Sequence, residues 1–372
     1  MKILHAFGTR PEAIKLAPVI LEFKRHKDCQ PVTAVTGQQR EMLDQVLALF
    51  TIKPDHDLDL MIPSQSLEHI TTAVLSGMGR ILEQERPDMV VIQGDTTTAL
   101  FAGLAAYYAK IPIGYVESGL RTDDAYRPFP EEMNRRLLSQ LATIHFAPTK
   151  RAAENLLHDG IRPDRIHVTG NTVIDALKLI AERHLKFKSE TLAAIDFTDR
   201  RVILLTAHRR ESHGRPMEQI FAAVAELAKA HPDILVVFPV HPNPAIKSLA
   251  KQRLSGLPNI MLTAPLDYTD LVLLLKRCYL VLTDSGGIQE EAPAFGKPVL
   301  VLRDRTERPE GVAAGVAKLV GTDKGRIVAE ADRLLDDPKA YRQMAKTANP
   351  YGDGQAANRI VEAIIEYLRP IK

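Results

Sequence analysis

Short apolar runs alternate with amphipathic stretches along most of the chain. In the first half, runs typical of buried parallel strands occur at Ile3–Phe7, Val32–Thr36, Met89–Gln93, Ile113–Glu117 and His145–Ala147. Between them, apolar residues recur at helical spacing in Glu12–Lys24, Glu41–Phe50, Leu67–Glu85, Thr97–Ala109 and Glu131–Leu141. This β-α-β alternation predicts a doubly wound α/β domain built on a parallel sheet.

The same alternation restarts after Gly170-Asn171. The second set of predicted strands is Val202–Thr206, Leu235–Val240, Ile260–Leu262, Leu280–Thr283 and Val299–Leu302. The helical patterns between these strands are Met217–Ala230, Pro244–Leu254, Tyr268–Arg277 and Ile288–Phe295. The charged, weakly patterned stretch 187–200 predicts a hinge or linker near 170–200, and a last helix is predicted at Gln355–Leu368. We therefore expect two Rossmann-type domains, residues 1–169 and 170–354.

Composition agrees with two soluble globular domains. The length of 372 residues exceeds the size at which a single core stops growing, about 250–300 residues. With 45% hydrophobic and 25% charged residues, the chain is not a disordered, collagen-like or disulfide-scaffold protein. A net charge of +2 gives no basic field for a nucleic acid polymer. The absence of tryptophan argues against a sugar site built on indole stacking.

The cellular setting is predicted from cysteines and apolar runs. Cys29 and Cys278 lie far apart and suggest neither a metal site nor a disulfide framework, so we expect a reducing, cytoplasmic location. No apolar run reaches about 18 residues, so we expect no membrane span. The first eight residues are too short an apolar segment for a signal peptide and are expected to form a strand.

Polar and glycine-rich clusters follow the predicted strands in both halves. They are Gly8–Glu12, Gly94–Thr96, Glu117–Thr122, Ala207–Glu211, His241–Pro244 and Asp284–Gly287. Open α/β sheets bind ligands beyond the carboxyl ends of their strands. The clusters therefore predict one cleft between two Rossmann-like domains.

Two of these clusters have the features of phosphate sites. Residues 283–291 combine a strand, a small-residue turn and a helix start, which suits a diphosphate, and Glu291 is placed to accept ribose hydroxyl hydrogens. In the first half, Arg10 and Lys15 can neutralise phosphate. The alternative for residues 283–291 is a tight turn followed by a capped helix. The alternative for Arg10 and Lys15 is that they are two solvated cations at a helix start. The phosphate-loop pattern GxxxxGK[ST] is absent.

Several acidic residues and histidines stand at strand ends. Asp95 is either a helix cap or an acid–base group, whereas Glu117 does not directly precede a helix, which favours a functional role. Glu131, with Glu132, opens a predicted helix and can act as a dipole partner or an acid. His208 and His241 end strands of the second half. No metal-ligand spacing and no GxSxG elbow is present. These residues leave open a glycosyltransferase or a sugar-nucleotide isomerase.

The joint pattern of motifs resembles the non-hydrolysing UDP-N-acetylglucosamine 2-epimerases. The matching segments, in order over nearly the whole chain, are Gly8–Glu12, Gln93–Thr98, Glu117–Thr122, Phe129–Arg135, Gly170–Thr172, Ala207–Glu211, Pro239–Pro244, Asp284–Pro293 and Thr306–Glu310. The resemblance implies a GT-B-like fold whose last helix, 355–372, packs back on the first domain. It also implies a homodimer and interconversion of UDP-N-acetylglucosamine (UDP-GlcNAc) and UDP-N-acetylmannosamine (UDP-ManNAc), which supplies sugars for surface polysaccharides, with no cofactor and no metal.

The resemblance also implies roles for single residues. The catalytic set is Asp95, Glu117, Glu131 and His208. The substrate-binding set is Arg10, Lys15, Asn171, Leu266, Leu271, Ser285, Gly286, Gly287, Glu291 and Arg308. Inversion at C2 needs acid–base groups on both faces of the sugar and a cationic cradle that retains UDP.

The chain departs from the family pattern at two places. The base-binding loop commonly carries Gln and Phe where Leu266 and Leu271 stand here, so an aromatic wall is lost. Many bacterial members bind a second UDP-GlcNAc as an activator through a Gln-His-Arg-Gln segment and a later Arg. Here that segment is Gln38-Gln39-Arg40-Glu41 and Ser64 takes the Arg position, while Gln38, Glu41, Glu211 and His241 stay candidate contacts. We therefore expect weak or absent activation.

Alternatives to this function are a hydrolysing 2-epimerase, an epimerase for a related UDP-2-acetamido sugar, a GT-B glycosyltransferase, and a catalytically idle sugar-nucleotide sensor. The carboxylates Asp95, Glu117 and Glu131 argue against the last two.

Overall fold

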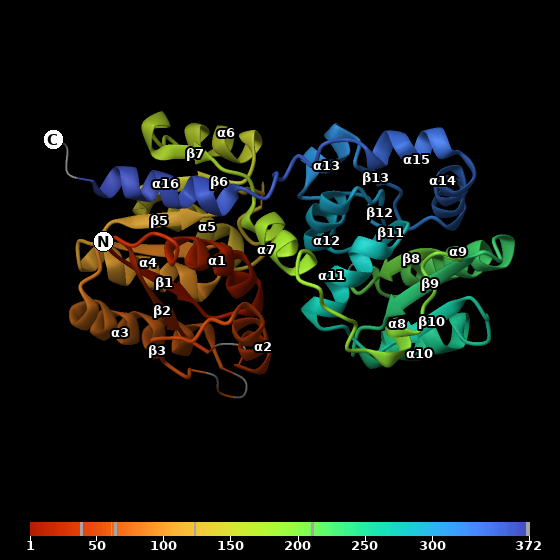
Figure 1. The fold of residues 1–372 in the computed structure, drawn as a ribbon, viewed down its shortest axis with the longest axis horizontal. Coiled ribbons are helices and arrows are strands. Elements are labelled where there is room, and N and C mark those ends of the chain that lie inside the picture. The colour runs from red at the N-terminus through yellow and green to blue at the C-terminus, as the bar shows by residue number, and fades with distance from the viewer. Residues whose placement is uncertain (38–39, 61, 63–64, 123, 210–211, 370–372) are drawn as a thin grey trace. The chain divides into compact units, whose positions relative to one another are not determined.

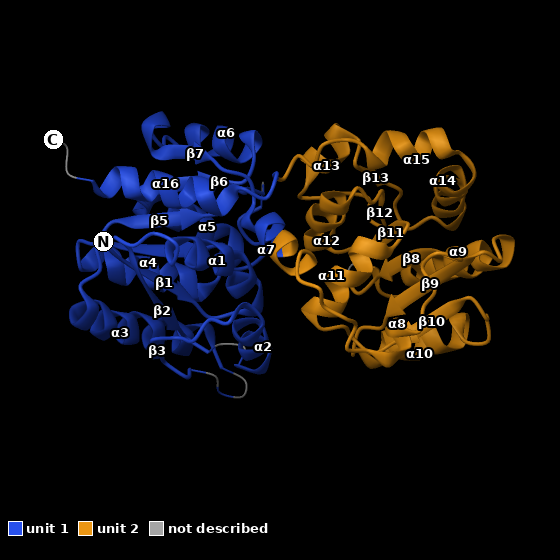
Figure 2. Ribbon diagram, viewed as in Figure 1, with its two compact units in different colours: residues 1–176, 352–372 blue, residues 177–351 orange. Residues whose placement is uncertain are grey.

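The computed structural model describes residues 1–37, 40–60, 62, 65–122, 124–209 and 212–369. The chain divides into two compact units. Unit 1 contains residues 1–176 and 352–372, and unit 2 contains residues 177–351. Figure 1 labels the elements and Figure 2 colours the two units.

Unit 1 is built on a parallel sheet. Among the described residues its strands lie in the order β3 (His56–Asp57), β2 (Gln30–Val35), β1 (Lys2–Phe7), β4 (Met89–Gln93), β5 (Ile113–Val116), β6 (Ile144–Ala147) and β7 (Ile166–Val168). Its helices are α1 (Arg10–Phe23), α2 (Arg40–Phe50), α3 (Leu67–Glu85), α4 (Thr97–Tyr108), α5 (Glu131–Leu141), α6 (Lys150–His158), the start of α7 (Thr172–Ala181) and α16 (Ala356–Leu368).

Unit 2 repeats the architecture. Its described strands lie in the order β10 (Ile260–Thr263), β9 (Ile234–Pro239), β8 (Arg201–Thr206), β11 (Leu280–Thr283), β12 (Val299–Val301) and β13 (Ala317–Leu319). Its helices are α8 (Glu190–Ala193), α9 (Arg215–Ala230), α10 (Pro244–Leu254), α11 (Tyr268–Arg277), α12 (Gly286–Glu291), α13 (Pro309–Ala314), α14 (Lys324–Asp336) and α15 (Pro338–Ala345).

The central strands are apolar because helices cover both faces of each sheet. All five residues of β4 are buried, and so are all four of β11. Fully covered parallel strands lose the alternation seen in half-exposed strands, which is why these segments are continuous apolar runs. The predicted fold class, two Rossmann-type doubly wound parallel sheets, is confirmed. Among the described residues, no helix is both long and apolar enough to cross a membrane.

Each sheet reverses its strand order once. In unit 1 the reversal lies between β1 and β4, and in unit 2 it lies between β8 and β11. Such a reversal opens a crevice at the carboxyl edge, where ligands bind in doubly wound sheets. The polar clusters after Phe7, Gln93, Thr206 and Thr283 therefore stand at the binding edge of each sheet.

The C-terminal helix belongs to unit 1. The Asp175 carboxylate accepts a 2.8 Å hydrogen bond from the backbone N–H of Ala357, in the first turn of α16. Arg359 donates to the carbonyl of Thr169 and forms an ion pair with Asp353. Polar contacts thus hold α16 beside the start of α7.

Some elements differ from the sequence expectations. The short edge strands β3, β7 and β13 were not predicted. The helix expected at 288–295 is α12 followed by a tighter 3-10 turn at Ala292–Phe295, because Pro293 has no N–H to continue an α-helix. The stretch 170–200 holds α7 and α8, and the boundary between the units falls inside α7.

Candidate functional site

The turn between β1 and α1 is held by a buried carboxylate. Glu12 is 1% exposed, and its Oε2 accepts hydrogen bonds from the N–H groups of Gly8 (3.1 Å) and Thr9 (2.8 Å). Its Oε1 accepts a 2.7 Å hydrogen bond from the Thr96 hydroxyl, in the turn after β4. Burial raises the pKa of Glu12 above its usual value, although these donors oppose the shift. Glu12 therefore ties together the two turns that flank the strand reversal of unit 1.

Glu117 is the centre of the polar cluster in unit 1. It follows β5 with a left-handed backbone (φ 61°), which is costly for a residue other than glycine, and it is 7% exposed. Lys15 donates from Nζ to both carboxylate oxygens at 2.6 Å, and Asn171 donates to Oε1 at 3.1 Å. Gln93 donates to Oε2. Such donors stabilise a carboxylate in its charged form.

Asp95 interacts with an arginine rather than capping a helix. The N-cap of α4 is Thr96, whose hydroxyl accepts from the N–H of Ala99. The Asp95 carboxylate accepts a 2.9 Å hydrogen bond from Nε of Arg135, and its backbone carbonyl accepts from Asn134. Both partners lie on α5, so Asp95 is fixed between the β4 turn and that helix.

The two acidic residues that open α5 differ in their surroundings. Glu132 is fully buried and accepts hydrogen bonds from the N–H of Thr122 (3.0 Å) and Nε of Arg136 (2.8 Å). Glu131 has a buried Oε2 that accepts no hydrogen bond from any described residue. Glu132 therefore braces the loop after Glu117, while Glu131 has acceptor capacity left for a ligand.

In unit 2, a histidine and an aspartate meet at the strand reversal. His208 Nδ1 lies 3.2 Å from Oδ1 of Asp284, and the His208 ring stacks on that of His241 with centroids 5.5 Å apart. Burial favours a raised pKa for Asp284, but the nearby His208 ring and two backbone N–H donors bring the pKa below its usual value. Burial and the neighbouring His208 lower the pKa of His241.

Arg308 lies against the turn after β11. Its Nε donates a 2.7 Å hydrogen bond to Glu290, which is 3% exposed. A Cβ on Gly286 would lie 3.3 Å from Cζ of Arg308, so glycine lets the guanidinium approach the start of α12 closely. Glu307 lies 3.5 Å from Nη1 of Arg308. Although burial opposes it, the charges of Arg308 and Arg303 bring the pKa of Glu307 below its usual value.

The remaining predicted residues occupy these same turns or lie outside them. Arg10 is the first residue of α1, Ser285 is the N-cap of α12, and Gly287 and Glu291 lie on α12. Leu266 and Leu271 are half-buried against the apolar core of unit 2. Glu41 is exposed in the first turn of α2. Gln38, Ser64 and Glu211 lie outside the described residues.

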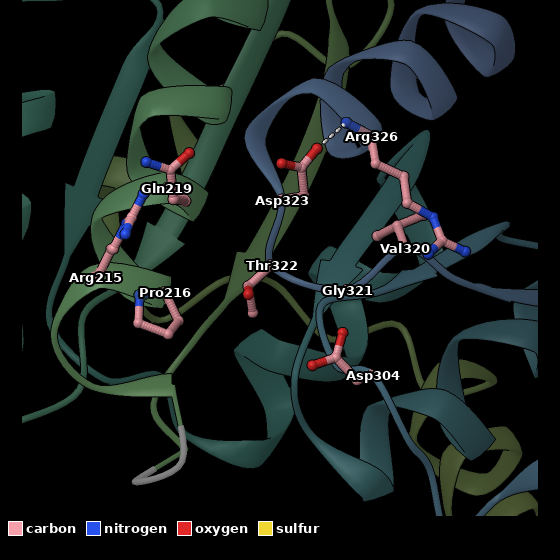
Figure 3. A pocket seen from close by; sticks show the side chains of 9 residues that line it. All are labelled: Arg215, Pro216, Gln219, Asp304, Val320, Gly321, Thr322, Asp323 and Arg326. Atoms are coloured by element: carbon pink, nitrogen blue, oxygen red, sulfur yellow. Dashed lines mark hydrogen bonds between the residues drawn. The ribbon is translucent and has the colours of Figure 1, made fainter.

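Unit 2 also has a cavity of about 360 Å³, drawn in Figure 3. It is lined by Arg215, Pro216, Gln219, Asp304, Val320, Gly321, Thr322, Asp323 and Arg326. None of the residues predicted from the sequence lines it. Its two lining carboxylates, Asp304 and Asp323, balance its two arginines. Asp323 caps α14 by accepting a hydrogen bond from the N–H of Arg326 (Figure 3). Within the described residues, no group of His, Cys, Asp and Glu is arranged to hold a metal ion.

Four polar residues that complete these clusters lie in segments that the sequence analysis named, but none of them was given a role there. Gln93 is the last residue of β4, Arg135 is one turn into α5, and Asp284 directly follows β11. Glu12 had the clearest signal, because Thr9-x-x-Glu12 is a capping-box pattern at a helix start.

Comparisons with known proteins agree with one another. A family model described as UDP-N-acetylglucosamine 2-epimerase matches residues 21–365. A UDP-N-acetylglucosamine 2-epimerase from Escherichia coli K12 is 51% identical over 369 residues, covering 98% of each chain.

Solved structures are similar over the same length. A UDP-GlcNAc 2-epimerase from Neisseria meningitidis, solved with UDP-GlcNAc bound, has a TM-score of 0.89 and 49% identity, covering 98% of this chain and 100% of its own. An S. aureus protein solved with UDP has a TM-score of 0.87 and 48% identity, covering 100% of this chain and 97% of its own.

Proposed function

Because this chain belongs to the UDP-N-acetylglucosamine 2-epimerase family, we propose that it catalyses the reversible C2 epimerisation of UDP-GlcNAc to UDP-ManNAc. The relatives with UDP-GlcNAc or UDP bound support the choice of substrate. The product would supply N-acetylmannosamine units for surface polysaccharides.

The chemistry explains why the site needs several carboxylates. The C2 hydrogen of this sugar is not next to a carbonyl, so direct deprotonation is prohibitive. In the proposed route a base takes the C2 proton while the C1–O bond breaks and its electron pair leaves with UDP, which gives 2-acetamidoglucal. UDP then adds back at C1 while an acid delivers a proton to the opposite face of C2. Acid–base groups positioned in this way typically contribute about 10²–10⁴-fold to the rate.

The single observation that carries this proposal is the environment of Glu117. A buried carboxylate in a strained backbone conformation, held by Lys15, Gln93 and Asn171, costs folding free energy. Groups that are costly for folding concentrate at catalytic sites. We assign Glu117 to proton transfer at C2 and Lys15 to holding its charge and orientation.

Asp95 and Glu131 complete the proposed acid–base set. Arg135 keeps Asp95 fixed at the end of β4, and the buried Oε2 of Glu131 has no hydrogen bond from any described residue. Both side chains come from elements next to Glu117, because β4 pairs with β5 and α5 follows β5.

We assign the binding of UDP to unit 2, and we assign Arg10 at the start of α1 to the binding of phosphate. The close approach of Arg308 to Gly286 supports a diphosphate near Ser285, Gly286 and Gly287. Glu291 would accept the ribose hydroxyls, with Leu266 and Leu271 beside the base, and His208 would face the leaving diphosphate. These residues would retain UDP between elimination and addition.

A product assay separates the proposed function from its alternatives. Purified protein incubated with UDP-GlcNAc should give a mixture of UDP-GlcNAc and UDP-ManNAc, resolved by ion-pair chromatography and ¹H NMR. Free N-acetylmannosamine with free UDP would instead identify a hydrolysing enzyme. An unchanged substrate would contradict both.

Two matched variants test the assignment of Glu117. Glu117→Gln should abolish the conversion while UDP still binds in calorimetry, because an amide cannot take the C2 proton. Glu85→Gln is the control, since Glu85 also pairs with a lysine, Lys2, at 3.1 Å. That pair lies at the amino end of β1, whereas Lys15 lies in α1, beyond the carboxyl end of β1. Full activity of Glu117→Gln, or equal losses in the two variants, would refute the role.

We further propose a homodimer in the cytoplasm. Tyr107 and Tyr108 at the end of α4 are 57% and 66% exposed, and Leu137 on the adjoining α5 is 48% exposed. Apolar side chains at this exposure favour a protein partner, for which a second copy is our assignment. Sedimentation should give twice the chain mass, and Tyr108→Lys should lower the measured mass.

The free thiols of Cys29 and Cys278 suit a reducing compartment, which is the basis for proposing the cytoplasm.

We also propose weak activation by UDP-GlcNAc. Arg40 stands in the segment that binds the activator in many relatives, and here it is paired with Asp57 (2.5 Å) and Asp44 (3.2 Å). A guanidinium engaged by carboxylates is less available to a phosphate. The initial rate from UDP-ManNAc should therefore not rise when trace UDP-GlcNAc is added, and a steep rise would contradict this proposal.

A further inference from the structure

Asp284 interacts with one histidine through both its backbone and its ring. The Asp284 side chain is fully buried directly after β11. Its Oδ2 accepts hydrogen bonds from the N–H groups of His208 at 2.6 Å and Arg209 at 2.8 Å. Its Oδ1 lies 3.2 Å from Nδ1 of His208. One carboxylate thus fixes the start of the loop after β8 and the imidazole that the loop presents.

The contact at Nδ1 determines what the other ring nitrogen offers. A carboxylate beside Nδ1 favours the proton on that nitrogen, and the second nitrogen of the ring, Nε2, is then left to exchange a proton with a ligand. The His208 side chain is 37% exposed, whereas that of Asp284 is fully buried. Of these two side chains, the imidazole reaches the surface and the carboxylate does not, so we expect Asp284 to act on a ligand through His208.

Two further histidines, an arginine and a glutamate lie in the surroundings of this pair. His241 stacks on the His208 ring at an interplanar angle of 10°, and His213 adds its charge to the surroundings of His241. Arg209, next to His208, lies 3.7 Å from Glu307. Among the residues that the structure describes, Asp284 is the acidic group in direct contact with the His208 ring.

We propose that Asp284 is a positioning residue for the epimerase reaction. It orients His208 and keeps a proton on Nδ1, so that in the imidazolium form of the ring the N–H at Nε2 donates its proton to the departing diphosphate of UDP and takes it back. This inference rests on the proposed function. Across a full cycle the proton leaves Nε2 for a diphosphate oxygen as the C1–O bond breaks, and it returns to Nε2 when UDP adds again. Asp284 itself neither gains nor loses a proton.

The chain offers a control for the simpler possibility that Asp284 only braces a loop. Asp270 is 4% exposed and also accepts two backbone hydrogen bonds, from Lys188 at 2.8 Å and Ser189 at 3.0 Å. The part of the structure described here shows no histidine ring against it. Asp284→Asn and Asp270→Asn thus remove the same charge from the same kind of backbone site.

Kinetics of four variants test the inference. Asp284→Asn should lower kcat by about 10–10²-fold, with a smaller change in KM, because the amide holds the ring without its negative charge. The basic limb of its pH profile for kcat should move by about one unit to lower pH. In Asp270→Asn the limb should keep its position. The double variant Asp284→Asn/His208→Gln should be no slower than His208→Gln alone, because the aspartate acts through the histidine.

Either of two kinetic results would overturn the inference: additive losses in the double variant, or an unmoved pH limb in Asp284→Asn. If that variant does not fold, ¹⁵N NMR of the histidines in the unaltered protein decides. The neutral His208 ring should be protonated on Nδ1, and protonation on Nε2 would overturn the inference. This NMR measurement needs no turnover, so a failure of the proposed epimerase activity is distinguishable from a failure of the positioning role.

Discussion

Replacing Asp175 with asparagine should stabilise unit 1 at neutral and alkaline pH and leave its stability unchanged in acid. Asp175 lies on α7, is 6% exposed, and accepts a hydrogen bond at Oδ1 from the N–H of Ala357 in α16. Its Oδ2 is buried with no hydrogen-bond partner among the described residues. Burial raises the pKa of Asp175 from 3.8 to about 6, although the backbone donors of α16 oppose the shift.

The size and sign of the effect follow from this pKa. Between the unfolded value of 3.8 and the folded value of about 6, the native state binds a proton that the unfolded state has released. Stability therefore falls as the pH rises through this window. At about 1.4 kcal/mol per pKa unit, the charged carboxylate destabilises the native state by about 3 kcal/mol above the window. Asparagine keeps the acceptor for Ala357 and has no charge to bury.

Urea unfolding at about pH 8 and pH 4, followed by circular dichroism, measures the difference. Hydrogen exchange of residues 356–368 assigns it to α16. The variant should be more stable at the higher pH, and the gain should shrink towards zero at the lower pH. A variant that is less stable than the natural protein at about pH 8 would refute the reasoning.

Asp353, four residues from Ala357, is the control with the opposite sign. Its ion pair with Arg359 lowers the pKa of Asp353 to about 2, so its contribution is present above 3.8 and is lost as the pH falls through about 2. Because the Asp353 side chain is 59% exposed, Asp353→Asn should cost less than about 1 kcal/mol near neutral pH.

Two further predictions concern the site of unit 1 and its supporting loop. Lys15→Met should lower kcat by about 10²-fold, because Glu117 loses the cation that orients it, and steady-state kinetics with a kcat within twofold of the natural protein would contradict this. Gly119→Ala should cost at least about 3 kcal/mol in urea unfolding, because its φ is 93° and the new Cβ would lie 2.2 Å from a backbone oxygen of α6. Gly160→Ala is its control, since φ of Gly160 is 84° but no atom would lie within 4 Å of the new Cβ. We expect this variant to lose only about 1 kcal/mol of stability. Equal losses in the two variants would refute the steric argument.

The alternation of apolar runs predicted the interior of both sheets well. Strands such as β4 and β11 are buried on both faces, and a continuous apolar run is a strong local signal. The edge strands β3 and β13 have two and three residues and are partly exposed, so hydrophobicity alone does not distinguish them from loops. The family resemblance stated on the motifs is confirmed by the family model and by relatives of about half identity.

The predicted site residues depended on strand ends, and their partners depended on the fold. That Asp95, Glu117, His208 and Asp284 follow strands is visible in the sequence. That Lys15 contacts Glu117 is not, because 102 residues separate them and the parallel sheet brings them together. The sequence also left open whether Asp95 caps α4, because Asp95 and Thr96 both directly precede that helix. The structure shows that Thr96 is the N-cap.

Isotope exchange tests the central claim most directly. UDP-GlcNAc incubated with the protein in D₂O and followed by ¹H and ²H NMR should give UDP-ManNAc that carries deuterium at C2. Deuterium should also accumulate at C2 of the recovered UDP-GlcNAc, and Glu117→Gln should show neither. UDP-ManNAc that retains the original C2 hydrogen, or substrate with no exchange and no product, would contradict proton transfer at C2.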